Sequence, residues 1–245
     1  MTTMNDFMPP KQDSLFSASR LNMRDSIEMS LTSLRTWFPM HPHVVVMFSG
    51  GKDSTATLTF VLWAIYSGKV PAPESITVVL SDTRLELPPL MTSAMRLMDE
   101  AREMGEEMFR EGRGPRVETR VVLAPVDERI LVYMLGRGVP PATNNTMRWC
   151  TRLAKGKPAT LALKSARGEH PNALVLTGLR LGESAVRDRR IDTVCSKNGG
   201  ECGAGLYQMV GGKGGGAVLA PLLHWRSCHV WEWNFGWAPK EEFGG

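Results

Sequence analysis

The chain has 245 residues, of which 42% are hydrophobic and 22% charged, and its formal net charge is +4. These values exclude a disordered chain, a collagen-like chain and a coiled coil, and they predict a globular protein with a full core. No segment approaches the ~20 apolar residues of a membrane span, and the polar N-terminus lacks the apolar region of a secretory signal. We therefore expect a cytoplasmic protein that does not enter a membrane and keeps its cysteines reduced.

The predicted elements alternate between helices and strands. Residues 1–20 are expected to be a flexible lead-in, and residues 21–245 a single domain with a glycine-rich excursion at 192–216. Helical spacing of apolar residues, with Ser227 as the N-cap of the last segment, predicts helices over 21–38, 56–68, 88–109, 127–135, 151–164 and 227–233. Short apolar runs predict buried strands over 43–48, 75–80, 117–123, 172–177 and 217–223. This alternation is typical of βαβ units, so we expect an α/β fold with a mostly parallel sheet flanked by helices.

Residues 49–54, with the sequence SGGKDS and here called the phosphate loop, lie between a predicted strand and a predicted helix. Paired glycines let the backbone approach a phosphate, and a helix N-terminus offers free N–H groups with a partial positive charge. Lys52 adds a mobile charge, and Asp53 could orient the loop or help to hold Mg²⁺. The spacing is not that of a Walker A loop. The alternative is a tight turn with a fortuitous lysine. The residues expected to contact phosphate are Ser49, Gly50, Gly51, Lys52, Asp53, Ser54 and Thr55.

The phosphate loop resembles that of the PP-loop ATP pyrophosphatases, which adenylate a substrate with ATP and release pyrophosphate. The related phosphoadenosine phosphosulfate (PAPS) reductases carry a similar loop that often lacks the lysine, so Lys52 favours ATP chemistry. The other matching segments, in chain order, are Asp82-Thr83, 148–151 (RWCT), 178–187 (GLRLGESAVR), 220–225 (APLLHW) and Val230-Trp231. The chain is most similar to the subgroup that contains the DNA phosphorothioation protein DndC.

The resemblance implies an adenine-nucleotide α-hydrolase-like fold with its ligand at the carboxyl ends of the strands. Arg180 and Arg187 would stabilise the charge on the leaving pyrophosphate, and Glu183 would pair with one of them. The alternative for these three residues is a surface ion-pair cluster. The resemblance further implies that the nucleotide is bordered by Asp82, Thr83 and Arg148, and that Mg²⁺ is placed by Asp53 or Asp82.

The four cysteines form a second candidate site, and they are Cys150, Cys195, Cys202 and Cys228. They fall on predicted loops and helix starts, where thiolates are accessible to a metal. Four thiolates could hold an iron–sulfur cluster or zinc, and the absence of a C-x-x-C pair weakens zinc most. The resemblance supports a 4Fe-4S cluster, with free thiols as a further alternative. For His224 and His229, which flank Cys228, packing or capping is favoured over metal binding.

Together these features predict an ATP pyrophosphatase that activates a substrate for sulfur transfer, with ATP, Mg²⁺ and a 4Fe-4S cluster as cofactors. The expected acceptor is DNA or tRNA, the expected sulfur donor is a protein such as a cysteine desulfurase, and a protein partner is expected to complete the site. One alternative is a reductase of adenylylated sulfate. Another is a non-catalytic nucleotide-binding subunit of a defence or modification complex.

Overall fold

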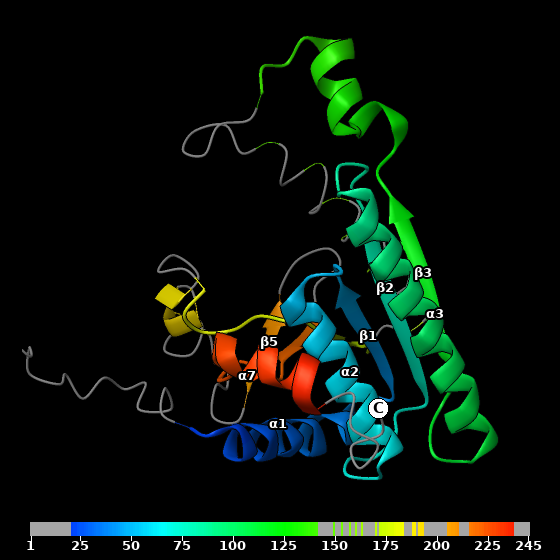
Figure 1. The fold of residues 1–245 in the computed structure, drawn as a ribbon, viewed down its shortest axis with the longest axis vertical. Coiled ribbons are helices and arrows are strands. Elements are labelled where there is room, and N and C mark those ends of the chain that lie inside the picture. Colours follow the sequence, from blue (N-terminus) through cyan, green and yellow to red (C-terminus); the bar gives the residue numbers. More distant parts are fainter. Residues whose placement is uncertain are drawn as a thin grey trace, which may run out of the picture.

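A six-stranded sheet forms the centre of the protein (Figure 1). The computed structural model describes residues 21–141, 149, 153, 157, 160, 163, 170, 172–183, 188–189, 191–193, 205–210 and 216–237. The strands are β1 (His43–Phe48), β2 (Ser75–Asp82), β3 (Val117–Leu123), β4 (Leu174–Leu176), β5 (Leu206–Val210) and β6 (Gly216–Ala220). Their order is β3-β2-β1-β4-β6-β5, and every neighbouring pair is parallel except the antiparallel pair of β5 and β6. The predicted α/β fold with a mostly parallel sheet is therefore confirmed.

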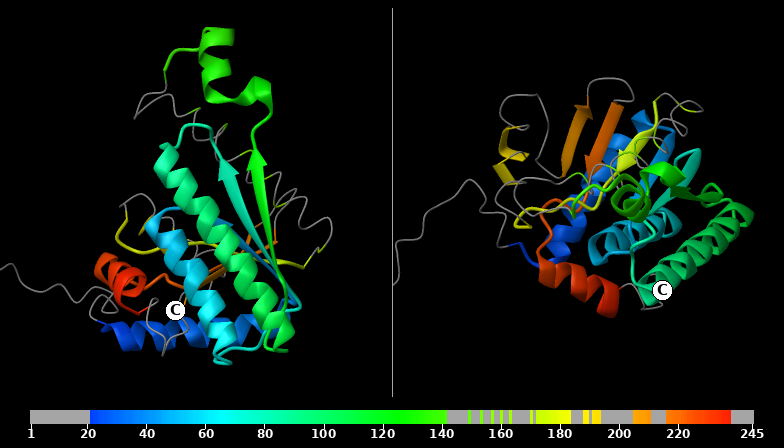
Figure 2. Two further views of the ribbon diagram at one scale, coloured as in Figure 1. Left: turned by 45° about the vertical axis from the view of Figure 1, so that its right-hand side comes forward. Right: turned by 90° about the horizontal axis from the view of Figure 1, so that it is seen from above.

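Among the described residues, four α-helices accompany the sheet, namely α1 (Met23–Trp37), α2 (Lys52–Tyr66), α3 (Pro88–Arg110) and α7 (Ser227–Glu232). Figures 1 and 2 show α2, α3 and α7 on the same side of the sheet. The largest core cluster joins apolar residues of all four helices to Val44 and Val46 of β1, while Val45 packs in a second cluster with Val79 and Val175. Because β1 is buried on both faces, its sequence is a continuous apolar run.

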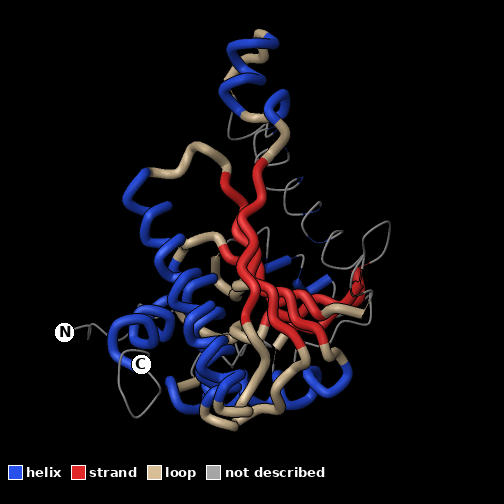
Figure 3. The backbone as a smooth tube through the Cα atoms, turned by 90° about the vertical axis from the view of Figure 1, so that its right-hand side faces the viewer, coloured by secondary structure: helices blue, strands red, loops and turns tan. Residues whose placement is uncertain are grey.

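Strands β2 and β3 extend together beyond the rest of the sheet, as Figure 3 shows. Their register is parallel from the Ile76 and Val117 pair to the Asp82 and Leu123 pair. At the far end the chain forms a 3-10 turn at Val126–Glu128 and a π-helical turn at Val132–Gly136. The helix that we predicted over 127–135 is confirmed only in its second part, because residues 130–137 are helical while residues 126–128 form the separate 3-10 turn. Arg129, between them, has an extended backbone (ψ 140°) that no continuous helix can accommodate.

Other predicted boundaries also need correction. Strand β5 lies inside the excursion predicted over 192–216; it was missed because it is short, half-exposed and flanked by glycines. Helix α2 begins at Lys52, inside the phosphate loop, and β2 continues to Asp82. The N-cap of α7 is Arg226 and not Ser227, because Arg226 has an extended backbone (φ −80°, ψ 163°) and Ser227 is already the first helical residue. The chain leaves β6 at Ala220, which shortens the predicted strand 217–223.

The predicted lead-in over 1–20 and most of the predicted helix over 151–164 lie outside the described residues. The division into a lead-in and one domain therefore stays a prediction. Among the helices that the structure describes, none has the length and apolar character needed to cross a membrane.

Candidate functional site

The phosphate loop leaves the carboxyl end of β1 at the point where the strand order reverses. Strand β1 pairs with β2 on one side and with β4 on the other, while the chain runs from β1 to β2 before it reaches β4. Such a topological switch point opens a crevice at the carboxyl ends of the two diverging strands. The predicted loop, the end of β4 and the first turn of α2 therefore meet at one place.

Two glycines allow α3 and the end of β4 to pack closely against the phosphate loop. Gly50 has a φ of +70°, and a Cβ atom there would lie 2.9 Å from Cβ of Ala94 in α3. Gly178 follows β4, and a Cβ atom on it would lie 3.0 Å from the backbone of Asp53 and Ser54. Side chains at these positions would push α3 and the end of β4 away from the loop, so glycine sets the width of the site.

Hydroxyl groups hold the loop in shape from within. The Ser54 hydroxyl donates to the Gly51 carbonyl at 2.9 Å and accepts from the Ser49 backbone N–H at 3.2 Å. It also bonds the Ser49 hydroxyl at 3.0 Å. Gly51 is the N-cap of α2, and it has no side chain with which to cap the first-turn N–H groups. Those groups and the positive end of the helix are therefore left for an anion.

A chain of three charged side chains crosses the site. Lys52 Nζ contacts Asp53 Oδ2 at 2.7 Å, and Arg180 Nε donates to Asp53 Oδ1 at 2.5 Å. Burial raises the pKa of Asp53, but the hydrogen bonds and charges of Arg180 and Lys52 outweigh burial and leave this pKa below its ordinary value. Two cations share one carboxylate, so the group carries a net positive charge.

The two cations differ in exposure. The Arg180 side chain is 4% exposed and the Lys52 side chain 31%. Arg180 also donates to the Trp225 carbonyl at 3.2 Å and to the Ser227 hydroxyl at 3.4 Å, so its guanidinium is fully engaged inside the protein. Lys52 is therefore the end of the chain that a bound ligand can reach.

Three side chains of the C-terminal segment hydrogen-bond to the start of α2, to its middle and to α1, and the sequence analysis did not predict these contacts. The Asn234 amide donates to the Lys52 carbonyl at 3.1 Å, and the Trp233 indole donates to the Thr59 hydroxyl at 3.0 Å. The Trp225 indole donates to the Ser30 hydroxyl at 2.9 Å. Only Trp225 carried a sequence signal, because it lies in the segment 220–225 that supported the resemblance.

A cavity of about 290 Å³ lies on the β4 side of the loop. Its polar lining includes two carboxylates, those of Asp53 and Glu183. Carboxylate oxygens are ligands that Mg²⁺ prefers, so this donor set fits a magnesium ion beside an anionic ligand. The full lining consists of Met47, Ser49, Gly51, Asp53, Ser54, Thr177, Gly178, Leu179 and Glu183.

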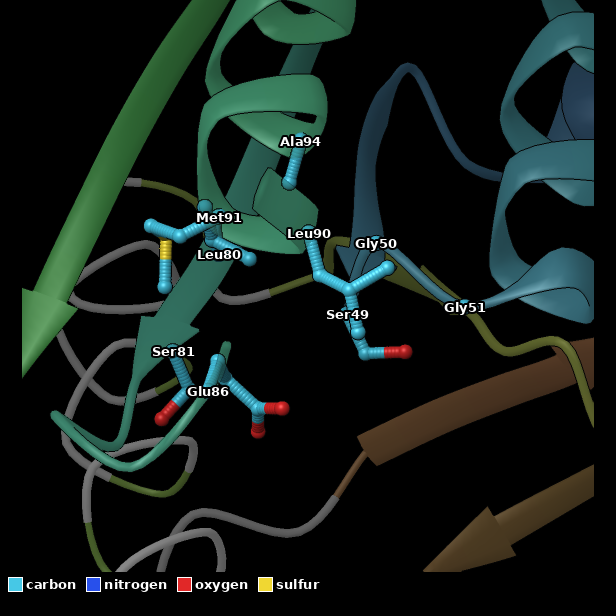
Figure 4. Close-up of a pocket in the computed structure, with 9 residues that line it drawn as sticks. All are labelled: Ser49, Gly50, Gly51, Leu80, Ser81, Glu86, Leu90, Met91 and Ala94. Atoms are coloured by element: carbon cyan, nitrogen blue, oxygen red, sulfur yellow. The ribbon is translucent and has the colours of Figure 1, made fainter. Parts of the chain in front are cut away.

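A second cavity, of about 210 Å³, lies on the β2 side of the same loop (Figure 4). Leu80 of β2 with Leu90, Met91 and Ala94 of α3 gives it apolar walls. Figure 4 shows Ser81 and Glu86 together at another side of this space. The lining is completed by Ser49, Gly50 and Gly51, so the loop borders both cavities.

Asp82 and Thr83 shape the turn that leads from β2 toward α3. Asp82 accepts from the Arg84 backbone N–H at 2.8 Å and from Arg84 Nε at 3.1 Å, and Arg84 has a φ of +58°. The buried Thr83 hydroxyl donates to Glu86 Oε1 at 3.3 Å. Thr83 thus positions Glu86 at the cavity wall, while Asp82 holds the turn that precedes it.

Several predicted site residues lie outside the described residues, namely Arg148, Arg187, Cys150, Cys195 and Cys202. Cys228 is described and lies exposed in the first turn of α7. In the part of the chain that the structure describes, no group of three or more His, Cys, Asp or Glu side chains could hold a metal ion. His229 is buried, and its Nδ1 bonds the Ser26 hydroxyl at 3.2 Å, in agreement with a packing role.

The strand order and the loop at the switch point define an α/β protein of the PP-loop, adenine-nucleotide α-hydrolase-like kind. A solved structure with this fold is similar over most of the chain: an NAD⁺ synthetase from Burkholderia pseudomallei, with a TM-score of 0.50 and 13% sequence identity. The match covers 93% of this chain and 77% of the synthetase chain. No family model matches the sequence, and no curated protein matches it. The comparison confirms the predicted fold class, whereas the similarity to the DndC subgroup stays a prediction.

Proposed function

We propose that this protein is an ATP-using PP-loop enzyme that transfers an adenylyl group to an acceptor and releases pyrophosphate. The observation that carries the proposal is the position of Lys52. Its half-exposed ammonium lies at the start of α2, next to uncapped helix N–H groups and at the switch point of the sheet. Backbone N–H groups, a helix N-terminus and a reachable lysine are together suited to a triphosphate.

In this proposal the phosphates lie on the loop and in the cavity beside β4. Lys52 contacts them directly and stabilises the charge that develops on the leaving pyrophosphate. Arg180 is buried and bonded to Asp53, so we assign it a positioning role: it fixes Asp53, which in turn holds Lys52. Direct contact of Arg180 with pyrophosphate, as the sequence suggested, would require it to leave three internal partners.

Asp53 and Glu183 are the residues that would hold Mg²⁺. The ion would neutralise charge on the phosphate oxygens when bound. Both carboxylates line the cavity that Ser49, Gly51 and Ser54 also border. The residues present therefore fit a magnesium–phosphate ligand, because the carboxylates suit the cation and the phosphate loop suits the phosphates.

The cavity on the β2 side would take the nucleobase. Its walls of Leu80, Leu90 and Met91 suit a flat apolar ring, and Glu86 offers an acceptor for the exocyclic amine of adenine. Because the phosphate loop borders both cavities, one nucleotide could pass over the loop with its base on one side and its phosphates on the other.

The acceptor chemistry is proposed from the sequence resemblance alone. We propose sulfur transfer to DNA or tRNA, with a 4Fe-4S cluster held by the predicted cysteines and sulfur supplied by a donor protein. Cys228 is the one predicted ligand that the structure describes, and it would contribute an exposed thiol. Iron and acid-labile sulfide measured per chain after anaerobic purification test the cluster. About four of each support it, and zinc alone or no metal contradicts it.

Pyrophosphate release from ATP, measured with Mg²⁺ and candidate acceptors, tests the adenylyl-transfer proposal. Lys52→Ala should lower the rate by about 100-fold or more, because one stabilising cation is lost from the transition state. Lys69→Ala is the matched control, since Lys69 is exposed beyond the other end of α2. Turnover of adenylylated sulfate without ATP would instead support the reductase. ATP binding without pyrophosphate release would support the non-catalytic subunit.

A further inference from the structure

The outer edge of β3 ends the sheet on one side. In the described part of the chain no strand lies beyond it, and Figure 3 looks onto this edge with the described helix α3 to one side. Seven residues of β3 pair with β2, so the opposite edge presents a long row of backbone N–H and C=O groups. Such edges invite pairing with another strand unless they are short, bulged, covered, or protected by charged side chains or proline.

The second half of β3 lacks charged side chains that would protect its edge. Val121 and Leu123 are exposed apolar residues, and no lysine occurs between Val117 and Leu123. Pro115 and Pro125 flank the strand and limit any added pairing to the residues between them. The open length therefore corresponds to β3 itself.

The charged residues of β3, Glu118 and Arg120, lie symmetrically on either side of Thr119. Glu118 and Arg120 lie on the same face and contact each other at 2.9 Å within one chain. If a second β3 pairs antiparallel with Thr119 opposite its own copy, Glu118 lies opposite Arg120 of the second copy and Arg120 lies opposite its Glu118. Centring the pair on Glu118 or on Arg120 would instead place like charges opposite each other.

We propose that the outer edge of β3 is a self-association surface whose occupant is a second copy of this chain. The two β3 strands pair antiparallel about a two-fold axis at Thr119 and join the sheets of both copies into one. This contact is isologous, so it closes as a dimer rather than growing into a filament. It is independent of the nucleotide chemistry proposed above.

Charge-reversal variants of the full chain test this proposal. Glu118→Arg places arginine opposite arginine, and Arg120→Glu places glutamate opposite glutamate, so each variant should weaken the dimer by about tenfold or more. An equimolar mixture of the two variants restores both attractive pairs and should form a heterodimer. The Glu118 side chain is 64% exposed and that of Arg120 is 32% exposed, so circular dichroism is used to check that each variant is folded.

Mass is measured by light scattering during size-exclusion chromatography, over a dilution series of each protein and of the mixture. The expected result is a wild-type dimer, weakened dimers of both single variants and recovery in the mixture. A wild-type monomer at every concentration overturns the proposal. A dimer that neither variant weakens also overturns it, because that dimer must use another surface. The proposal is likewise overturned if the equimolar mixture dimerises no more strongly than either variant alone.

Discussion

Arg180 and Asp53 are 127 positions apart in the sequence, yet the Arg180 guanidinium donates to the Asp53 carboxylate at 2.5 Å. This contact ties the end of β4 to the first turn of α2 across the switch point. It also occupies one carboxylate oxygen from the inside and leaves the other to Lys52 on the exposed side. The phosphate loop therefore depends on a residue that the loop sequence does not contain.

Replacement of Arg180 should affect both stability and catalysis. Arg180→Met removes a buried partner of Asp53, so the free energy of unfolding should fall by about 2 kcal/mol, with Lys52 still pairing the carboxylate. Pyrophosphate release should fall by about 100-fold. Arg180→Lys should recover only part of the rate, because lysine lacks the planar fork that reaches Asp53 and Trp225 together. The measurements are urea unfolding and steady-state kinetics.

The matched control for this change is Arg189→Met, since the Arg189 side chain is exposed. It should leave both unfolding and the rate of pyrophosphate release unchanged. Wild-type kinetics in Arg180→Met would contradict the positioning role and return Arg180 to the alternative of a purely structural ion pair.

Gly178→Ala should distort the site without removing any polar group. The added Cβ would lie 3.0 Å from the Asp53 carbonyl and the Ser54 backbone nitrogen, and neither can move without shifting the first turn of α2. We expect a loss of about 1–2 kcal/mol in stability and a raised KM for ATP. Gly236→Ala is the control, because nothing lies within 4 Å of its Cβ position. Equal KM values for the two variants would mean that the packing at Gly178 does not set the width of the site.

His229 should make stability dependent on pH. Burial, and next the charge of Arg226, lower the pKa of His229 below 6.5, while Glu232 opposes them. As pH falls below 6.5, His229 therefore gains a proton more readily in the unfolded chain than in the folded chain. The contribution of His229 to the stability of the folded state is complete above pH 6.5 and is lost as pH falls through the folded-state pKa.

The test compares unfolding of the wild type and His229→Gln across this range. The variant should lose less stability than the wild type between about pH 7.5 and pH 5.5, because glutamine does not titrate. The chain has five histidines, and subtracting the free energies of unfolding of the two proteins cancels the contributions of the other four. If the free energy of unfolding falls with pH in the same way in both proteins, the lowered pKa of His229 is contradicted.

The buried half of the fold was predictable from sequence because its signals are local. Strand β1 agrees with the predicted bounds, since burial on both faces demands a continuous apolar run. The pair Gly50-Gly51 likewise marked the turn that follows it. Strand β5 was not predictable, because an edge strand with a half-exposed pattern resembles a polar loop. The helix predicted over 127–135 begins later than expected, at residue 130, because the extended backbone of Arg129 separates it from the preceding 3-10 turn.

The site was predictable only in part, for a different reason. The sequence pointed to Lys52, Asp53 and Arg180, and the structure brings these three together. It could not assign Arg180 an internal partner, because that depends on which strand lies beside β1. The braces from Trp233 and Asn234 are contacts between segments distant in sequence, and a single sequence holds no record of such pairs.

The bracing of the phosphate loop by the C-terminal segment has a consequence for biosynthesis. Residues 49–54 leave the ribosome before the groups that support them, which are the Trp225 carbonyl, the Ser227 hydroxyl and the Asn234 amide. Until then Arg180 lacks two of its acceptors and the Lys52 carbonyl lacks its donor. A nascent chain would therefore contain the phosphate loop without these hydrogen bonds, and nucleotide binding would begin only after the segment through Asn234 has emerged.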